Sequence, residues 1–312
     1  MGPQDITHLH LLLNHVPTIG TVVGLGLFLM SFVRRSEHLK HVSLEVLYLI
    51  ALATLPAYIS GLAAQATILD RPDVSAEAIM AHHDAALVSF IFIEITGFVA
   101  WLGLWQYRRI ERMSGWVTPA IFVLGLVTFA MVSGAATIGG EIRHPEIKIE
   151  ESAIAPAGVI PAKAVAEFVT TNPWVWPAAE ALHFLGLSLL FGVLFTVNLR
   201  LMGGLRSVDY AALHKLLPWA MLGFGVNLVT GMLFTIAAAD QYISNPPFMW
   251  KVAFMMVAGA NLLYLTVYDR LWELKAGQEP VFIDRAVAMS AVAVWIGVIY
   301  AGRMLPFLGN AF

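Results

Sequence analysis

The sequence predicts an all-α polytopic membrane protein with eight transmembrane helices arranged in two four-helix halves. Charged residues make up only 12% of the 312 residues, and hydrophobic residues make up 59%. A soluble domain usually carries about 25% charged residues, whereas the mean hydropathy here is +0.75. The apolar residues form long continuous runs of about 20, the length that crosses a bilayer as a helix. They do not alternate with polar residues as in barrel strands.

Eight segments meet this requirement for length and apolarity. Pro56 is predicted to kink the second of them, and Pro17 to open the first helix locally after Asn14, because proline has no N–H to donate. The predicted helices cover residues 10–33, 43–66, 83–106, 116–138, 178–202, 211–238, 247–271 and 284–306.

An even number of helices places both termini on the same side of the membrane, called side A here; the opposite face is side B. Twelve of the 18 lysines and arginines fall in the side B loops, with three in each of those four loops. Short basic loops stay in the cytoplasm. The sequence therefore predicts a multi-pass protein of the bacterial inner membrane with both termini extracytoplasmic.

The longest connection, about residues 139–177, lies on side A and is rich in proline and alanine, with a short helix predicted near Ala162–Val169. We divide the chain around it into an N-terminal four-helix domain (1–150), an extracytoplasmic connection (151–176) and a C-terminal four-helix domain (177–312).

Composition excludes several functions. The chain has no cysteine, which rules out disulfides, thiolate metal sites, iron–sulfur clusters and covalently attached c-type heme within it. No nucleotide-binding loop, GxSxG or HExxH motif is present. The net charge of −3 gives no indication of nucleic-acid binding, and no catalytic residue can be assigned.

Histidines are concentrated on side A. Seven of the ten fall there, and only three fall on side B. Each one alone is explained as a half-buried imidazole at the membrane interface. As a group at one depth they indicate a cofactor, because imidazole is the commonest metal ligand and the usual axial ligand of b-type heme. The side A histidines are His8, His10, His15, His82, His83, His144 and His183.

The first functional hypothesis is a heme-b-binding membrane subunit of a larger respiratory or redox complex. One or two hemes would lie at the extracytoplasmic face, within reach of a c-type cytochrome or other redox subunits. His15 and His83 are the preferred axial ligands, His10 and His144 form a second pair, and His183 is a further candidate that lacks a partner.

The alternative is a copper, zinc or iron site used for transport, delivery or catalysis. Its ligands would come from His15, His82, His83, Asp84, Glu141 and His144. Glu141 and His144 have the E-x-x-H spacing of di-iron bundles, although Gly139-Gly140 and Pro145 argue against helix there. His82 and His83 point about 100° apart on a helix, so at most one faces a given partner. A third reading is a structural subunit with incidental histidines.

Glu94 is a candidate proton relay. It lies near mid-membrane in a run of apolar residues, where a carboxylate is costly and marks a functional site by default. It follows His83 by eleven residues, or three turns, so both residues share one helix face and Glu94 is predicted to face the bundle interior.

Several short stretches resemble uncharacterised bacterial families of multi-helix membrane domains. The N-terminal half is similar to one family in His10-x4-His15-x-Pro17, Pro56-Ala-Tyr-x-x-Gly61, His82-His83-Asp84 and the run from Gly139 to Ile147. Residues 183–262 resemble a second such group. The resemblance implies four-helix membrane domains with a histidine-rich extracytoplasmic face. One departure is that Leu262 follows Asn261, where the second group has a histidine.

Overall fold

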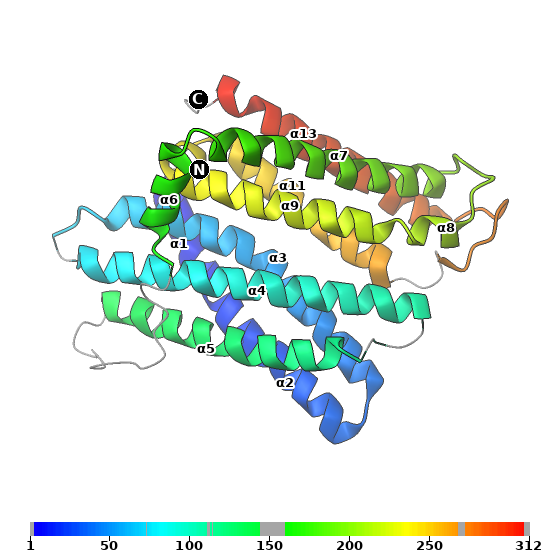
Figure 1. Cartoon of the computed structure of the whole chain (residues 1–312), viewed down its shortest axis with the longest axis horizontal. Helices are drawn as coiled ribbons and strands as arrows, with labels where there is room; N and C mark the ends of the chain where they lie inside the picture. Colours follow the sequence, from blue (N-terminus) through cyan, green and yellow to red (C-terminus); the bar gives the residue numbers. More distant parts are fainter. Residues whose placement is uncertain are drawn as a thin grey trace. The chain divides into compact units, whose positions relative to one another are not determined.

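A computed structural model describes residues 3–72, 74–110, 113, 115–143, 160–267 and 272–308 (Figure 1). Within these residues every regular element is a helix, and eight helical spans are long and apolar enough to cross a membrane. The predicted fold class is confirmed. The chain divides into two compact units, Met1–Val165 and Ala166–Phe312, and each unit is described by itself.

Unit 1 contains four membrane spans, of which the first is built from two helices. In Figure 1, α2, α3, α4 and α5 run alongside one another. The helix α3 packs against α1, α2 and α4, while α5 packs against α4 and α2, so the four spans surround a common interior. The helices are α1 (Pro3–Leu13), α2 (His15–Arg34), α3 (Glu37–Ile68), α4 (Ala76–Ile110) and α5 (Val117–Arg143).

The break in the first span is at the predicted place. The helix α1 ends at Leu13 and α2 starts at His15, two residues before Pro17. The N–H of Asn14 still donates to the carbonyl of His10 at 2.8 Å, so the helical path bends without unwinding. Pro56 does not interrupt α3, which continues as one helix from Glu37 to Ile68.

Unit 2 contains the other four spans. The helix α7 packs against α9 and α13, and α11 packs against α13. The short helix predicted in the connection is confirmed as α6, which begins in unit 1 and ends in unit 2. The helices are α6 (Ala162–Thr171), α7 (Val175–Leu201), α8 (Tyr210–His214), α9 (Leu217–Ala237), α10 (Ala239–Ile243), α11 (Pro246–Val267) and α13 (Phe282–Leu308).

Two glycines bring α7 and α9 into close contact. A Cβ added at Gly223 would lie 2.6 Å from the carbonyl oxygen of Gly186 and 2.9 Å from the amide nitrogen of Leu190. Helices in membranes associate through such close packing of small residues, since lipid provides no hydrophobic force between them.

Gly223→Ala should therefore destabilise unit 2. The new methyl meets backbone atoms, which cannot turn aside as a flexible side chain can, and overpacking of this kind costs about 1–3 kcal/mol. Gly192→Ala on α7 is the matched control, because nothing lies within 4 Å of its Cβ position. Thermal unfolding in detergent should show a lower midpoint for Gly223→Ala only. Equal midpoints would contradict the close crossing.

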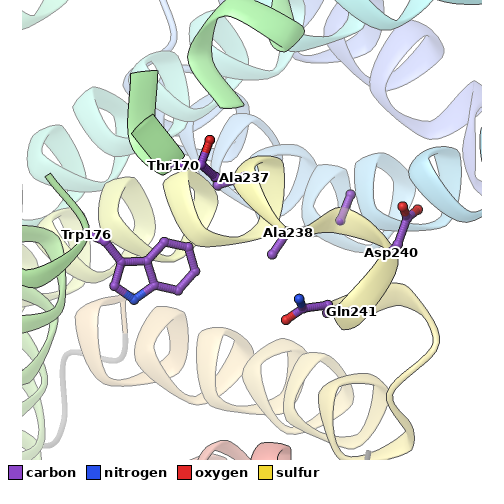
Figure 2. Close-up of a pocket in the computed structure, with 7 residues that line it drawn as sticks. Thr170, Trp176, Ala237, Ala238, Asp240 and Gln241 are labelled. Carbon is purple, nitrogen blue, oxygen red and sulfur yellow. The ribbon is translucent and has the colours of Figure 1, made fainter. Parts of the chain in front are cut away.

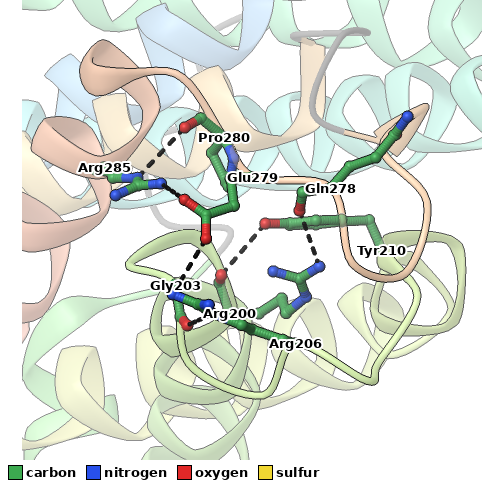
Figure 3. A network of polar contacts seen from close by, with 8 residues as sticks. All are labelled: Arg200, Gly203, Arg206, Tyr210, Gln278, Glu279, Pro280 and Arg285. Atoms are coloured by element: carbon green, nitrogen blue, oxygen red, sulfur yellow. Dashed lines mark hydrogen bonds and ion pairs between the residues drawn. The ribbon is translucent and has the colours of Figure 1, made fainter.

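At the end of unit 2 where α7 finishes, a polar network ties two loops together (Figure 3). Arg200 is fully buried. Its Nε donates to the carbonyl of Val208 at 2.9 Å and its Nη2 to that of Gln278 at 3.2 Å. The guanidinium carbon also lies 4.4 Å from the ring centroid of Tyr210. Arg200 thus fastens the segment after α7 to the segment before α13.

Glu279 completes this network on the surface. Its carboxylate pairs with Arg206 at 3.1 Å and with Arg285 at 2.5 Å. The hydrogen bond from Arg285 is the main reason that the pKa of Glu279 is lowered, and the charge of Arg206 adds to it. Because the folded pKa is lowered, the stabilisation is present at neutral pH and is lost as the pH falls through that folded pKa.

Candidate cofactor-binding site

Three histidines of unit 1 gather at the end where α3 finishes and α4 begins. His10 contacts Ala57 of α3, His83 contacts Tyr58, the next residue of that helix, and His82 precedes His83 in α4. His82 and His83 point to different helices, as predicted from their spacing: His82 contacts α5 and His83 contacts α3. The three histidine side chains therefore come from α1 and α4, and they contact α3 and α5.

His10 is held by α3. Its Nδ1 lies 3.1 Å from the carbonyl oxygen of Ala57. A carbonyl only accepts, so Nδ1 carries the proton, and in the neutral ring Nε2 keeps its lone pair. The ring lies against Gly61, where an added Cβ would approach its Cε1 to 3.0 Å. No described group hydrogen-bonds Nε2, so the ring presents a free nitrogen in a fixed orientation.

His82 is held by α5 in the same way. Its Nδ1 lies 3.0 Å from the carbonyl oxygen of Ala135, and a Cβ at Gly139 would approach its Cε1 to 2.8 Å. In both cases the accepting alanine precedes the glycine by four residues, one helical turn. This Ala-x3-Gly spacing, facing a histidine on a helix that packs against it, is a sequence signal that histidine depth alone did not reveal.

His83 is engaged differently. Its Nε2 lies 3.2 Å from the hydroxyl of Tyr58, and its Nδ1 is buried without a hydrogen-bond partner among the described residues. The ring of Tyr58 packs on Phe90 at 5.0 Å between centroids. His83 is therefore partly buried beside His82, and the Nε2 of His83 already has a hydrogen-bond partner.

The other predicted ligands are placed less favourably. His15 is exposed at the start of α2, so its pairing with His83 stays a prediction. His144 lies outside the described residues. Glu141 is partly buried in α5, which continues to Arg143 although Gly139-Gly140 suggested an earlier end. No three His, Asp or Glu side chains in the described part of the chain converge to hold a metal ion.

Asp84 forms a hydrogen bond with the connection that follows α5. Its Oδ1 accepts the N–H of Ala162, the first residue of α6, at 2.9 Å. That N–H has no partner within its own helix. The bond fixes the start of α6 beside α4, one residue from His83. Residues 144–159 of this connection lie outside the described residues.

Asp84→Ala should lower stability because it leaves this helix start without its acceptor. Loss of a capping side chain typically costs about 0.5–2 kcal/mol. Asp70→Ala is a suitable control, since Asp70 is an exposed carboxylate in the same unit. The unfolding midpoint in detergent should fall for Asp84→Ala and not for Asp70→Ala. An unchanged midpoint for both would remove the capping role.

Glu94 faces the interior of unit 1, as predicted. Its side chain is buried, and its Oε1 has no hydrogen-bond partner among the described residues. A carboxyl group within a membrane span is costly and is a functional candidate. Its role as a proton relay stays a prediction.

In unit 2, His183 repeats the arrangement with a hydroxyl as acceptor. Its Nδ1 lies 2.8 Å from Oγ1 of Thr230, which donates its own proton to the carbonyl of Val226 at 2.7 Å. The Thr230 oxygen therefore accepts from Nδ1–H, and Nε2 of His183 again keeps its lone pair.

A pocket of about 360 Å³ lies elsewhere in unit 2 (Figure 2). It is lined by Thr170, Trp176 and residues 237–241, and Figure 2 shows the indole of Trp176 at one side and Asp240 and Gln241 at the other. No histidine lines it, so the pocket is separate from the nitrogens available to a cofactor.

The fold defines the class as an all-α polytopic membrane protein. No family model, curated protein or solved structure matches the chain.

Proposed function

We propose that the chain is a heme-b-binding membrane subunit that transfers electrons at the extracytoplasmic face. One observation carries the proposal. His10 and His82 each donate Nδ1–H to a backbone carbonyl, lie against a glycine, and leave Nε2 without a described hydrogen bond.

This arrangement is what an axial ligand needs. A metal-ligating histidine almost always donates its other ring N–H to a carbonyl, carboxylate or water, which fixes the tautomer and raises the basicity of the ligand nitrogen. Two histidines on α1 and α4 with the same fixed tautomer, at the end of unit 1 where α3 finishes and α4 begins, would suit the two axial positions of one b-type heme.

The axial pair in this proposal is His10 and His82, in place of the His15 and His83 preferred from sequence. His83 and Tyr58 would border the heme. The copper, zinc or iron alternative is less well supported, because such ions take three or four protein ligands and no such group converges in the described part of the chain.

Electron transfer, rather than catalysis, follows from the coordination. An iron with two histidine ligands has no open position for a substrate. A heme near one face exchanges electrons with a partner at that face, and a c-type cytochrome or another redox subunit is the partner class we propose.

The composition of the purified, full-length protein tests this function. The pyridine hemochromogen assay and metal analysis should give b-type heme with iron in matching amount. Colourless protein with stoichiometric copper, zinc or iron would favour the ion-site alternative. Colourless, metal-free protein prepared with heme supplementation would overturn both.

The side of the membrane is tested separately. Alkaline phosphatase fused at the C-terminus should be active and a green fluorescent protein fused there should be dark, because the basic loops keep side B in the cytoplasm. Fusions at Met113, between α4 and α5, should behave in the opposite way. The reverse pattern would move the histidines to the cytoplasmic face and exclude the proposed partner class.

A further inference from the structure

His183 is the single histidine at the end of unit 2 where α7 begins. The other, His214, belongs to α8 and packs its ring on Trp272 at 4.6 Å between centroids. His214 comes after α7 has ended at Leu201. Leu201 itself lies roughly 27 Å along the helix from His183, at 1.5 Å per residue. Unit 2 therefore offers one imidazole at this depth.

The ring of His183 is oriented from two sides. Thr230 fixes Nδ1–H at 2.8 Å, and Phe234, one turn further along α9, packs edge-on at 5.8 Å between centroids. Phe234 in turn packs on Trp176 of α7 at 4.9 Å. The ring also lies against Gly231, where an added Cβ would be 3.6 Å from Cε1. No hydrogen bond to Nε2 is formed by any residue that the structure describes, and the ring lies beside aromatic side chains.

A cationic side chain lies on a neighbouring helix pair. Lys251 of α11 reaches toward α13, the helix that packs against α7, which carries His183. Its Nζ lies 3.7 Å from the Cβ position of Gly302 on α13. No carboxylate in the described part of the chain forms an ion pair with it. An ammonium within a membrane span is costly unless paired, so Lys251 calls for an anionic group.

We propose that unit 2 holds a second heme, with Nε2 of His183 as its axial ligand and Lys251 as the counter-ion of a heme propionate. The single molecule supplies both missing partners, an iron for the imidazole and a carboxylate for the ammonium. This inference rests on the proposed heme function. It adds a different coordination: with one imidazole at this depth, the iron would be five-coordinate and its sixth position would be open to a small ligand such as carbon monoxide.

The test compares heme content and carbon monoxide binding in the full-length protein and its variants. The unaltered protein should contain two hemes per chain, of which one binds carbon monoxide after reduction. His183→Ala should reduce the content to one heme and abolish carbon monoxide binding, while the heme of unit 1 keeps its spectrum.

Conservative variants separate ligand loss from misfolding. Thr230→Val keeps the shape but removes the acceptor of Nδ1–H, and loss of such a partner weakens binding by about 10–100-fold. Lys251→Met should release the heme at lower salt than the unaltered protein does. Gly192→Ala on α7 is the matched control and should bind normally, since nothing lies within 4 Å of its Cβ position.

The outcomes separate the two proposals. One heme per chain, unaffected by His183→Ala or Thr230→Val, would overturn the second site and leave the proposed function intact. Absence of any heme would overturn both. Two hemes with no carbon monoxide binding would overturn the five-coordinate assignment, because a second protein ligand would then occupy the iron.

Discussion

Replacement of His82 by alanine should abolish the low-spin heme spectrum of unit 1, and replacement of His10 should do the same. Each ring donates Nδ1–H to a backbone carbonyl, at 3.0 Å for His82 and 3.1 Å for His10. Each therefore holds Nε2 in a fixed direction without using its lone pair. A heme with two axial imidazoles loses its low-spin character when either is removed, because one axial position becomes vacant.

His15→Ala is the control that discriminates between the two candidate pairs. His15 is exposed at the start of α2, five residues from His10, so its loss should leave the spectrum and heme content unchanged. The measurement is the reduced-minus-oxidised spectrum at matched protein concentration. If His15→Ala and His83→Ala lost the low-spin heme while His10→Ala and His82→Ala kept it, the original sequence-based pair would be correct.

Gly139→Ala should weaken heme binding although it removes no ligand. The added methyl would lie 2.8 Å from Cε1 and 3.0 Å from Nδ1 of His82. The ring must move, and its hydrogen bond to Ala135 must lengthen or break. Overpacking costs about 1–3 kcal/mol, which corresponds to about 5- to 150-fold weaker binding if the cost falls on the bound geometry.

Gly140→Ala is an unusually close control. It is the next residue of the same helix, and nothing lies within 4 Å of its Cβ position. Heme titration of both variants, prepared without heme, should give weaker binding for Gly139→Ala only. Equal affinities would mean that the orientation of the His82 ring has no bearing on heme binding.

Much of the fold could be predicted from the sequence because each span carries its own signal. Apolar runs of about 20 residues locate the helices, and the missing N–H of Pro17 locates the break between α1 and α2. The 100° step between consecutive helical residues separates His82 from His83. These features depend on neighbours in the chain, so no knowledge of packing is needed.

The details of the candidate site could not be predicted because they depend on tertiary contacts. Whether His10 or His15 faces α3 is decided by how α1 and α2 are rotated on either side of the break at Asn14. The acceptors of Nδ1–H are the backbone carbonyls of Ala57 and Ala135. Every residue has a backbone carbonyl, so the residue type does not indicate which one accepts. Asp84, a plausible metal ligand by composition, accepts the first N–H of α6 instead.

The most direct test of the central claim is the visible spectrum of the purified protein, oxidised, then reduced, then exposed to carbon monoxide. The proposed axial ligation by His10 and His82 predicts the sharp α and β bands of reduced low-spin b-type heme. Carbon monoxide should leave that component unchanged, because both axial positions would be occupied. A protein without absorbance in the Soret region, or one in which carbon monoxide converts all of the heme, would contradict axial ligation by His10 and His82.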